Sequence, residues 1–147
     1  MIVYAQNKKA VFDYEILEKF EAGIELRGHE VKSIKSGKVS LTGSYVKVFG
    51  NEIFLLGAIV SPYQPRNVPK DYDEQRDRKL LLTKKEIDYL IGKQKERGLT
   101  IVPTKLYNKG GKVKLEIGVA RGKKKYDKRE TIKKRDVERR LRRGEEV

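Results

Sequence analysis

Apolar and polar residues alternate over residues 12–26, a pattern that predicts a long β-strand with one buried face. The alternating apolar residues are Phe12, Tyr14, Ile16, Phe20, Ala22, Ile24 and Leu26. A helical period would scatter the same residues around the helix axis. Gly23 falls inside the pattern and indicates a bulge or a bend, the feature by which a strand turns the corner of a small barrel.

Two other segments carry helical signals. Val31 and Ile34 are spaced by three residues and predict a short helix near residues 30–36. A better-marked helix begins at Thr83, because Thr83 and Glu86 form a capping box and an apolar stripe of helical spacing follows them. The fold is therefore predicted to contain helices that flank its strands.

The remaining β-rich runs form two pairs. Residues 45–49 and 53–59 are joined by Gly and Asn, which tolerate the positive backbone angles of a tight hairpin, and residues 99–107 and 113–119 form a second pair. Prolines and charged residues over residues 61–78 predict a long loop between the two pairs.

The fold class is predicted to be mainly β. About six short strands without a strand–helix–strand rhythm indicate a closed antiparallel barrel of the oligonucleotide-binding (OB-fold-like) kind, and closure would remove exposed strand edges. A chain of 147 residues with 37% hydrophobic residues suits one folded domain, which we assign to residues 1–120. Residues 121–147 are predicted to be a separate basic tail.

The charge of the chain indicates a polyanionic partner. It has 35 Lys and Arg residues against 21 Asp and Glu residues, a net charge of +14. Residues 121–147 hold 13 basic and 6 acidic residues and so carry half of that excess. Because they contain few large apolar side chains, we expect them to be disordered when free and to become helical on a polyanionic surface. A solvated tail that only improves solubility explains the same composition equally well.

The residue inventory excludes several classes of chemistry. The chain has no Cys and one His, which leaves no disulfide, no thiolate metal site and no zinc site built on two imidazoles. No secretory signal and no apolar stretch of about eighteen residues is found, so we expect no membrane segment and a cytoplasmic location. We therefore expect a protein that is not an enzyme and holds neither cofactor nor metal.

A metal-dependent nuclease is a distant alternative. Asp71, Asp73 and Asp77 are the candidate Mg²⁺ ligands, but Arg76 and Arg78 lie among them and compete for the carboxylates. The basic chain fits RNA recognition by stacking and phosphate contact better. The best stacking candidates lie in or beside predicted loops or in the tail, although simple surface packing explains them as well: Tyr63, Tyr72, Tyr107 and Tyr126.

Short motifs, in their order and spacing along nearly the whole chain, carry a family resemblance. They are Asn7-Lys8-Lys9-Ala10, Glu21-Ala22-Gly23-Ile24, Gly28-His29-Glu30-Val31-Lys32-Ser33, Ser44-Tyr45-Val46, Ser61-Pro62-Tyr63, Arg78-Lys79-Leu80-Leu81-Leu82, Gly118-Val119-Ala120-Arg121-Gly122-Lys123-Lys124 and Asp127-Lys128-Arg129. In these motifs the chain resembles the SmpB family, the SsrA-binding proteins that partner tmRNA in bacterial ribosome rescue. The resemblance implies an OB-type barrel that grips the tRNA-like domain of tmRNA.

The resemblance also implies a set of RNA-binding residues, or residues that shape that surface. They are Asn7, Lys8, Lys9, Glu21, Lys32, Arg78, Lys79 and Leu81. The strand alternation places Glu21 on the outward face, where its carboxylate can accept a hydrogen bond from a base amine or a 2′-hydroxyl. Without the family, a surface ion pair of Glu21 with Lys19 is the favoured interpretation.

In the family the tail enters the decoding centre and the empty mRNA channel of the stalled ribosome. The matching tail residues here are Gly122, Lys123, Lys124, Tyr126, Asp127, Lys128, Arg129, Lys133, Lys134 and Arg135, with Tyr126 where many members have His. The resemblance thus implies an adaptor, monomeric on its RNA, that delivers tmRNA to stalled ribosomes. A structural ribosomal protein with an rRNA-threading tail is the alternative.

Overall fold

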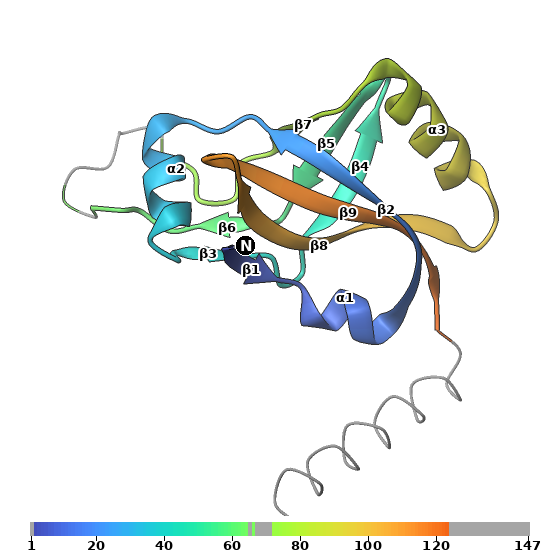
Figure 1. Ribbon diagram of the computed structural model, residues 1–147, viewed down its shortest axis with the longest axis horizontal. Coiled ribbons are helices and arrows are strands. Elements are labelled where there is room, and N and C mark those ends of the chain that lie inside the picture. The colour runs from blue at the N-terminus through green and yellow to red at the C-terminus, as the bar shows by residue number, and fades with distance from the viewer. Residues whose placement is uncertain (1, 65, 67–71, 124–147) are drawn as a thin grey trace, which may run out of the picture.

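A computed structural model describes residues 2–64, 66 and 72–123, and within them the strands form one large antiparallel sheet and one small one (Figure 1). The large sheet has the strand order β1-β8-β9-β2-β7-β5-β4, and β3 pairs with β6. The strands are β1 (Val3–Gln6), β2 (Tyr14–Ile24), β3 (Val39–Ser40), β4 (Tyr45–Phe49), β5 (Glu52–Leu56), β6 (Ile59–Val60), β7 (Arg78–Leu81), β8 (Leu99–Lys109) and β9 (Lys112–Gly122). The helices are α1 (Lys8–Asp13), α2 (Gly28–Lys35) and α3 (Lys84–Lys95). The prediction of a mainly β fold is confirmed.

The long strands β2, β9 and β8 separate an inner face from an outer face. Ala22 on β2 and Ile117 on β9 are fully buried, and Leu90 of α3 packs into the same core. Glu21 precedes Ala22 and Glu116 precedes Ile117, so both glutamates point to the outer face, where they lie opposite each other in the β2–β9 register. Side chains on that outer face are the ones that remain available for a ligand.

Several predicted elements are confirmed. The β4–β5 hairpin turns at Gly50, whose φ is +61°, and β8 and β9 form the second predicted hairpin. The N-cap of α3 is Thr83, whose hydroxyl accepts a hydrogen bond from the N–H of Glu86 at 3.2 Å. The predicted strand over residues 53–59 is split, because Gly57 has a φ of +77° and ends β5 before β6 begins.

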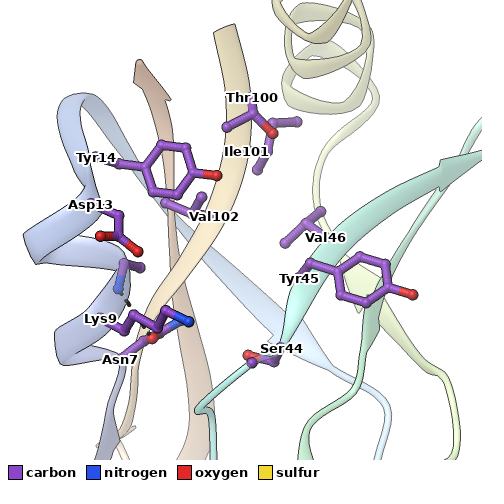
Figure 2. Close-up of a pocket in the computed structure, with 12 residues that line it drawn as sticks. Asn7, Lys9, Asp13, Tyr14, Ser44, Tyr45, Val46, Thr100, Ile101 and Val102 are labelled. Atoms are coloured by element: carbon purple, nitrogen blue, oxygen red, sulfur yellow. Dashed lines mark hydrogen bonds between the residues drawn. The ribbon is translucent and has the colours of Figure 1, made fainter. Parts of the chain in front are cut away.

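The predicted closure of the barrel is wrong, because the large sheet keeps open edges at β1 and β4. On the outer edge of β8, the backbone N–H of Asn7 donates to the carbonyl of Thr104 (2.7 Å), and its side-chain amide donates to that of Pro103 (3.0 Å). Pro103 also has no N–H to offer a neighbouring strand. A pocket of about 360 Å³ therefore lies between α1, the start of β4 and the start of β8 (Figure 2).

The N-terminal segment differs from the prediction, because β1 and α1 precede β2, which begins at Tyr14 and not at residue 12. Asn7 caps α1 by accepting a hydrogen bond from the N–H of Ala10 at 3.3 Å, the dashed line in Figure 2. Ala10 then packs with Val102 beneath the helix. A helix of six residues is too short for its apolar period to be read against the alternation that follows it.

Strand β7 was not predicted from the sequence, and it begins at Arg78, the last residue of the predicted loop. Its Leu80 is 1% exposed and pairs with Ile24 of β2 on one side and Ile53 of β5 on the other. A strand of four residues offers only two positions per face, too few for a recognisable alternation.

The bulge expected at Gly23 lies elsewhere. The register between β2 and β9 shifts between Ile16 and Glu18, whereas Gly23 pairs regularly with Leu81 of β7 and Lys114 of β9. A Cβ at Gly23 would lie 3.1 Å from the Cβ of Leu81. The glycine therefore serves the close approach of β7.

Candidate nucleic-acid interface

Glu21 lies on the outer face of β2, as the alternation predicts, and two side chains of β8 hold its carboxylate. The Tyr107 hydroxyl donates a hydrogen bond to one carboxylate oxygen, and the Lys109 ammonium lies 3.1 Å from the other. The hydrogen bond from Tyr107, and after it the one from Lys109, lowers the pKa of the Glu21 carboxyl below its usual value. Glu21 is therefore an ionised and exposed hydrogen-bond acceptor at neutral pH.

The Tyr107 side chain is not accessible for stacking, which differs from the prediction. Its side chain is buried, with 6% of the residue exposed, so it is not the free stacking ring that its position near a predicted loop suggested. Burial, followed by the hydrogen bond to the Glu21 carboxylate, raises the pKa of the Tyr107 phenol. The hydroxyl therefore stays protonated and donates. The ion pair of Glu21 is with Lys109, in place of the alternative pair with Lys19.

Leu81 lies on the same outer face as Glu21, one strand away, and is 48% exposed. A pocket of about 380 Å³ opens beside it. The pocket is lined by residues of β2, β7, α2, the β2–α2 connection and the β8–β9 hairpin: Gly23, Ile24, Leu26, Val31, Leu81, Gly111, Lys112, Val113 and Lys114. An apolar hollow with lysines in its lining and an ionised carboxylate nearby can accept an unstacked RNA base together with its phosphates.

Basic side chains surround this pocket. Lys114 of β9 contributes to the lowered pKa of the Glu21 carboxyl through its charge. Lys32 is exposed on α2, and Lys35 of the same helix donates to the carbonyl of Gly111 at 3.3 Å. This bond ties α2 to the β8–β9 hairpin and keeps the basic helix beside the pocket.

A second basic hollow of about 270 Å³ lies on the outer face near α1. Lys8, Lys19 and Lys105 line it together with Glu116, which lies 4.0 Å from the ammonium of Lys105. Lys9 lines the other pocket, the one between α1 and β4 (Figure 2). The structure thus places Lys8 on the face of Glu21 and Lys9 beside a different pocket.

Asn7 is internal and 4% exposed. Its side-chain oxygen caps α1, and its side-chain nitrogen donates to the carbonyl of Pro103. Asn7 therefore shapes the surface by starting α1 and placing Lys8, and it offers little area for direct contact with RNA.

The expected role of Arg78 in RNA binding needs a correction, because the residue is 1% exposed. Its Nε and Nη2 atoms lie 2.8 and 2.7 Å from one carboxylate oxygen of Glu30 on α2. Its other N–H groups donate to the carbonyls of Ala58 and Arg76 (both 3.1 Å) and Glu74 (3.2 Å). Arg78 faces the core because the alternation of β7 points it inward, and it holds α2 against the loop before β7.

Glu30 completes this buried cluster and is also 1% exposed. Besides Arg78, it receives hydrogen bonds from Nη2 of Arg76 at 2.5 Å and from the backbone N–H of Arg27 at 2.8 Å. Burial alone raises the pKa of the Glu30 carboxyl, but the bonds from Arg76, Arg27 and Arg78 outweigh it and leave the pKa below its usual value. The carboxylate is therefore charged and paired inside the protein.

The other predicted residues in the body of the protein are partly accessible. Lys79 points to the outer face of β7, and its ammonium lies 3.3 Å from the carboxylate of Glu52. Tyr63 is 42% exposed and remains available for stacking. Tyr72 is half-buried, and its hydroxyl donates to a backbone carbonyl of β6, which holds the loop in place.

The tail leaves the folded body beside α1. Gly122 ends β9, and the backbone N–H of Lys123 donates to the carbonyl of Asp13 at 2.9 Å. The remaining predicted tail residues lie outside the described residues: Lys124, Tyr126, Asp127, Lys128, Arg129, Lys133, Lys134 and Arg135.

Sequence reasoning missed Lys109 and Lys114 as parts of this surface, and it predicted a stacking role for Tyr107 in place of the hydrogen bond to Glu21. A signal for Lys114 was present, because the alternation that buries Val113 and Leu115 turns residue 114 outward. Nothing local in the sequence pairs Tyr107 or Lys109 with Glu21, since 86 and 88 positions separate them.

Within residues 2–64, 66 and 72–123, no three His, Asp or Glu side chains come together in a way that would hold a metal ion. Asp73, one of the candidate Mg²⁺ ligands, accepts a hydrogen bond from the N–H of Gln75 at 2.9 Å in a local turn. In the same part of the chain, no helix combines the length and apolar character that a membrane span requires.

Comparison with known proteins identifies the family. Residues 4–146 match the family described as SmpB protein. The SsrA-binding protein of Thermosipho africanus is 54% identical over 142 residues, covering 96% of this chain and 95% of that protein, and the one of Oleidesulfovibrio alaskensis is 55% identical over 139 residues, covering 95% and 89%. A solved chain described as "tmRNA-SmpB: a journey to the center of the bacterial ribosome" is 46% identical with a TM-score of 0.67, covering 82% of this chain and 84% of that one. This chain therefore belongs to the SmpB family.

Proposed function

We propose that this protein binds the tRNA-like domain of tmRNA and delivers it to stalled ribosomes in trans-translation, as an adaptor without catalytic chemistry of its own. Its relatives are named SsrA-binding proteins, and the description of the solved chain it resembles names tmRNA-SmpB and the bacterial ribosome. The observation that carries the proposal is the ionised Glu21 carboxylate, held by Tyr107 and Lys109 beside the exposed Leu81 pocket.

Each part of this surface has a distinct task in the proposal. The Glu21 carboxylate accepts a hydrogen bond from a base amine or a 2′-hydroxyl, a contact that a lysine cannot make. Leu81 and the apolar lining of its pocket contact an unstacked base. Lys8, Lys32 and Lys79 lie on the accessible surface around these groups and contact phosphates, which sets the position of the RNA without reading its sequence.

The division of labour between residues 1–120 and 121–147 is part of the same proposal. The tail carries half of the excess positive charge of the chain. Its described part, up to Lys123, lies beside α1, at the end of β9 opposite the β8–β9 hairpin (Figure 1). We infer that the tail takes shape in the decoding centre and the empty mRNA channel, where rRNA phosphates screen its like charges. A cytoplasmic location and a monomeric protein on its RNA complete the proposal.

Selective RNA binding tests the function directly. We expect the full chain to bind a labelled tRNA-like domain of tmRNA more tightly than an equal length of ribosomal RNA in a filter-binding assay. Equal affinity for both RNAs, together with stoichiometric presence on all ribosomes in a gradient, would instead assign the chain to the structural ribosomal proteins. RNA cleavage that a chelator abolishes would assign it to the nucleases.

Truncation tests the role of the tail. Deletion of residues 123–147 should leave binding of the tRNA-like domain within about twofold of the full chain, because Glu21 and Leu81 remain in place. Peptide tagging on ribosomes stalled without a codon should be lost. A truncated protein that supports normal tagging would remove the tail from the mechanism while leaving the tmRNA-binding surface intact.

A further inference from the structure

The outer face of β4 and β5 exposes aromatic rings that the surface described above does not use. Tyr45 and Phe49 on β4 are 52% and 46% exposed, and Phe54 on β5 is partly exposed. Val46 and Leu55, which follow Tyr45 and Phe54 in the sequence, point into the core. Large rings are usually covered in a folded protein, so a group of them on one sheet face indicates a contact surface.

The rings are arranged together with two lysines. Phe49 and Phe54 form an edge-to-face pair with centroids 5.6 Å apart and ring planes at 71°. Lys47 pairs in register with Phe54, and its ammonium lies 4.9 Å from the centroid of Phe49. Lys79 pairs in register with Phe54 from the other side, on β7. Phe54 therefore lies between a lysine on each neighbouring strand.

We propose that this aromatic–lysine patch, formed by Lys47, Phe49, Phe54 and Lys79, binds unpaired nucleotides of an RNA strand. Every base has a π-face that can stack on a phenylalanine ring, so such a platform tolerates many sequences. Lysines at the edges of the rings contact the phosphates that accompany the bases. In the described strands β4, β5 and β7, Glu52 is the one acidic residue on this face, and it is paired with Lys79.

The patch adjoins the Leu81 pocket, and in this respect the inference rests in part on the proposed function. Lys79 and Leu81 are alternate residues of β7 and share its outer face, about 7 Å apart along the strand. An RNA strand leaving the Leu81 pocket across β7 meets Lys79 first and then Phe54. The proposal thus extends the RNA-binding surface from β2 to the edge strand β4.

A fluorescence titration tests the patch directly. The chain has no Trp, so Phe49→Trp places a single indole on the patch of the full-length protein. An oligoadenylate of about 12 nucleotides, within the site sizes of stacking platforms, should quench this Trp as a base stacks on it. The matched control is Tyr89→Trp, at a ring on α3 that is 40% exposed and lies outside the proposed RNA-binding surfaces, where we expect no change.

Two variants of Phe49 separate stacking from general apolar contact. Phe49→Ala and Phe49→Leu should each raise the Kd for the oligoadenylate by about 5- to 100-fold, because both remove the aromatic face. Binding of inorganic polyphosphate should change by less than about twofold in both variants, since this ligand has charge but no base. Phe49 is almost half exposed, so both variants are expected to fold, which cooperative thermal unfolding checks.

Three results would overturn the inference. They are equal quenching of Trp at positions 49 and 89, an oligoadenylate affinity that Phe49→Leu leaves unchanged, and a shift from dimer to monomer in Phe49→Ala by ultracentrifugation, which would assign the face to a second copy. The proposed function has a separate readout. Glu21→Ala should lose the tRNA-like domain yet keep quenching at position 49, because Glu21 is not part of the patch.

Discussion

Two glutamates of this protein have similar partners in opposite surroundings. Glu21 accepts hydrogen bonds from Tyr107 and Lys109 on an exposed sheet face, whereas Glu30 accepts them from two arginines and a backbone N–H in the interior. Hydrogen bonding lowers the pKa of both carboxyls, against the opposing effect of burial, which is the largest single influence at Glu30. Both are charged, and access to water is the main difference.

That difference decides what each residue can do. An exposed carboxylate exchanges its partners with water at little cost, so Glu21 can turn to a ligand without loosening the fold. A buried one cannot lose a partner without leaving an uncompensated charge inside the protein. Glu30 therefore holds α2 to β7 and the loop before it, and Glu21 is available for recognition.

The largest expected effect is the loss of stability in Glu30→Ala. The variant leaves the Arg78 guanidinium buried without its carboxylate and should lower the free energy of unfolding by about 3–5 kcal/mol, measured by urea unfolding. The matched control is Glu15→Ala, which removes an exposed pair with Arg121 and should change little. The double variant Glu30→Ala/Arg78→Ala should lose less than the sum of the single losses. Additive losses would contradict a coupled buried pair.

The next largest effect is on RNA binding. Glu21→Ala should raise the Kd for the tRNA-like domain by about 10-fold or more, because a charged acceptor is lost. Leu81→Arg should also weaken capture, and the exposure of Leu81 makes this a clean test of the surface. Both variants should unfold cooperatively near the melting temperature of the parent protein. Unfolding at a much lower temperature would place Glu21 with Glu30 as a structural residue.

A smaller effect is expected from Tyr107→Phe, which removes the hydroxyl that orients the Glu21 carboxylate. The Kd for the tRNA-like domain should rise about 2- to 10-fold, because the carboxylate is still present and Lys109 still holds it. In the Glu21→Ala background the same change should add little. An equal loss in both backgrounds would show that Tyr107 acts independently of Glu21.

The smallest effect is a change in how the free energy of unfolding depends on pH under acidic conditions. The lowered pKa of Glu30 stabilises the folded protein above the ordinary carboxyl value of 4.5, and this contribution is lost as the pH falls through the folded pKa. Glu30→Gln should therefore flatten the decline of unfolding free energy below pH 4.5, while a profile as steep as that of the parent would show that other groups dominate.

The candidate site was predictable where local pattern governs it. The alternation along β2 turns Glu21 outward, and this orientation is confirmed. The same rule applied to β7 turns Arg78 inward and Leu81 outward, but a strand of four residues is too short to be recognised from its sequence pattern. The motif therefore predicts contact with RNA for Arg78, whereas in the structure Arg78 is buried and bonded to Glu30.

The sequence by itself determined the mainly β class, both long hairpins, the capped helix α3 and the outward position of Glu21, because each depends on residues close together in the chain. Only the tertiary structure decided that Tyr107 meets Glu21, that Arg78 meets Glu30, that Asn7 meets Pro103, and that the sheet stays open at β1 and β4. These contacts join positions 48 to 96 residues apart. They depend on which strands pair and in what register, and no short-range pattern encodes that choice.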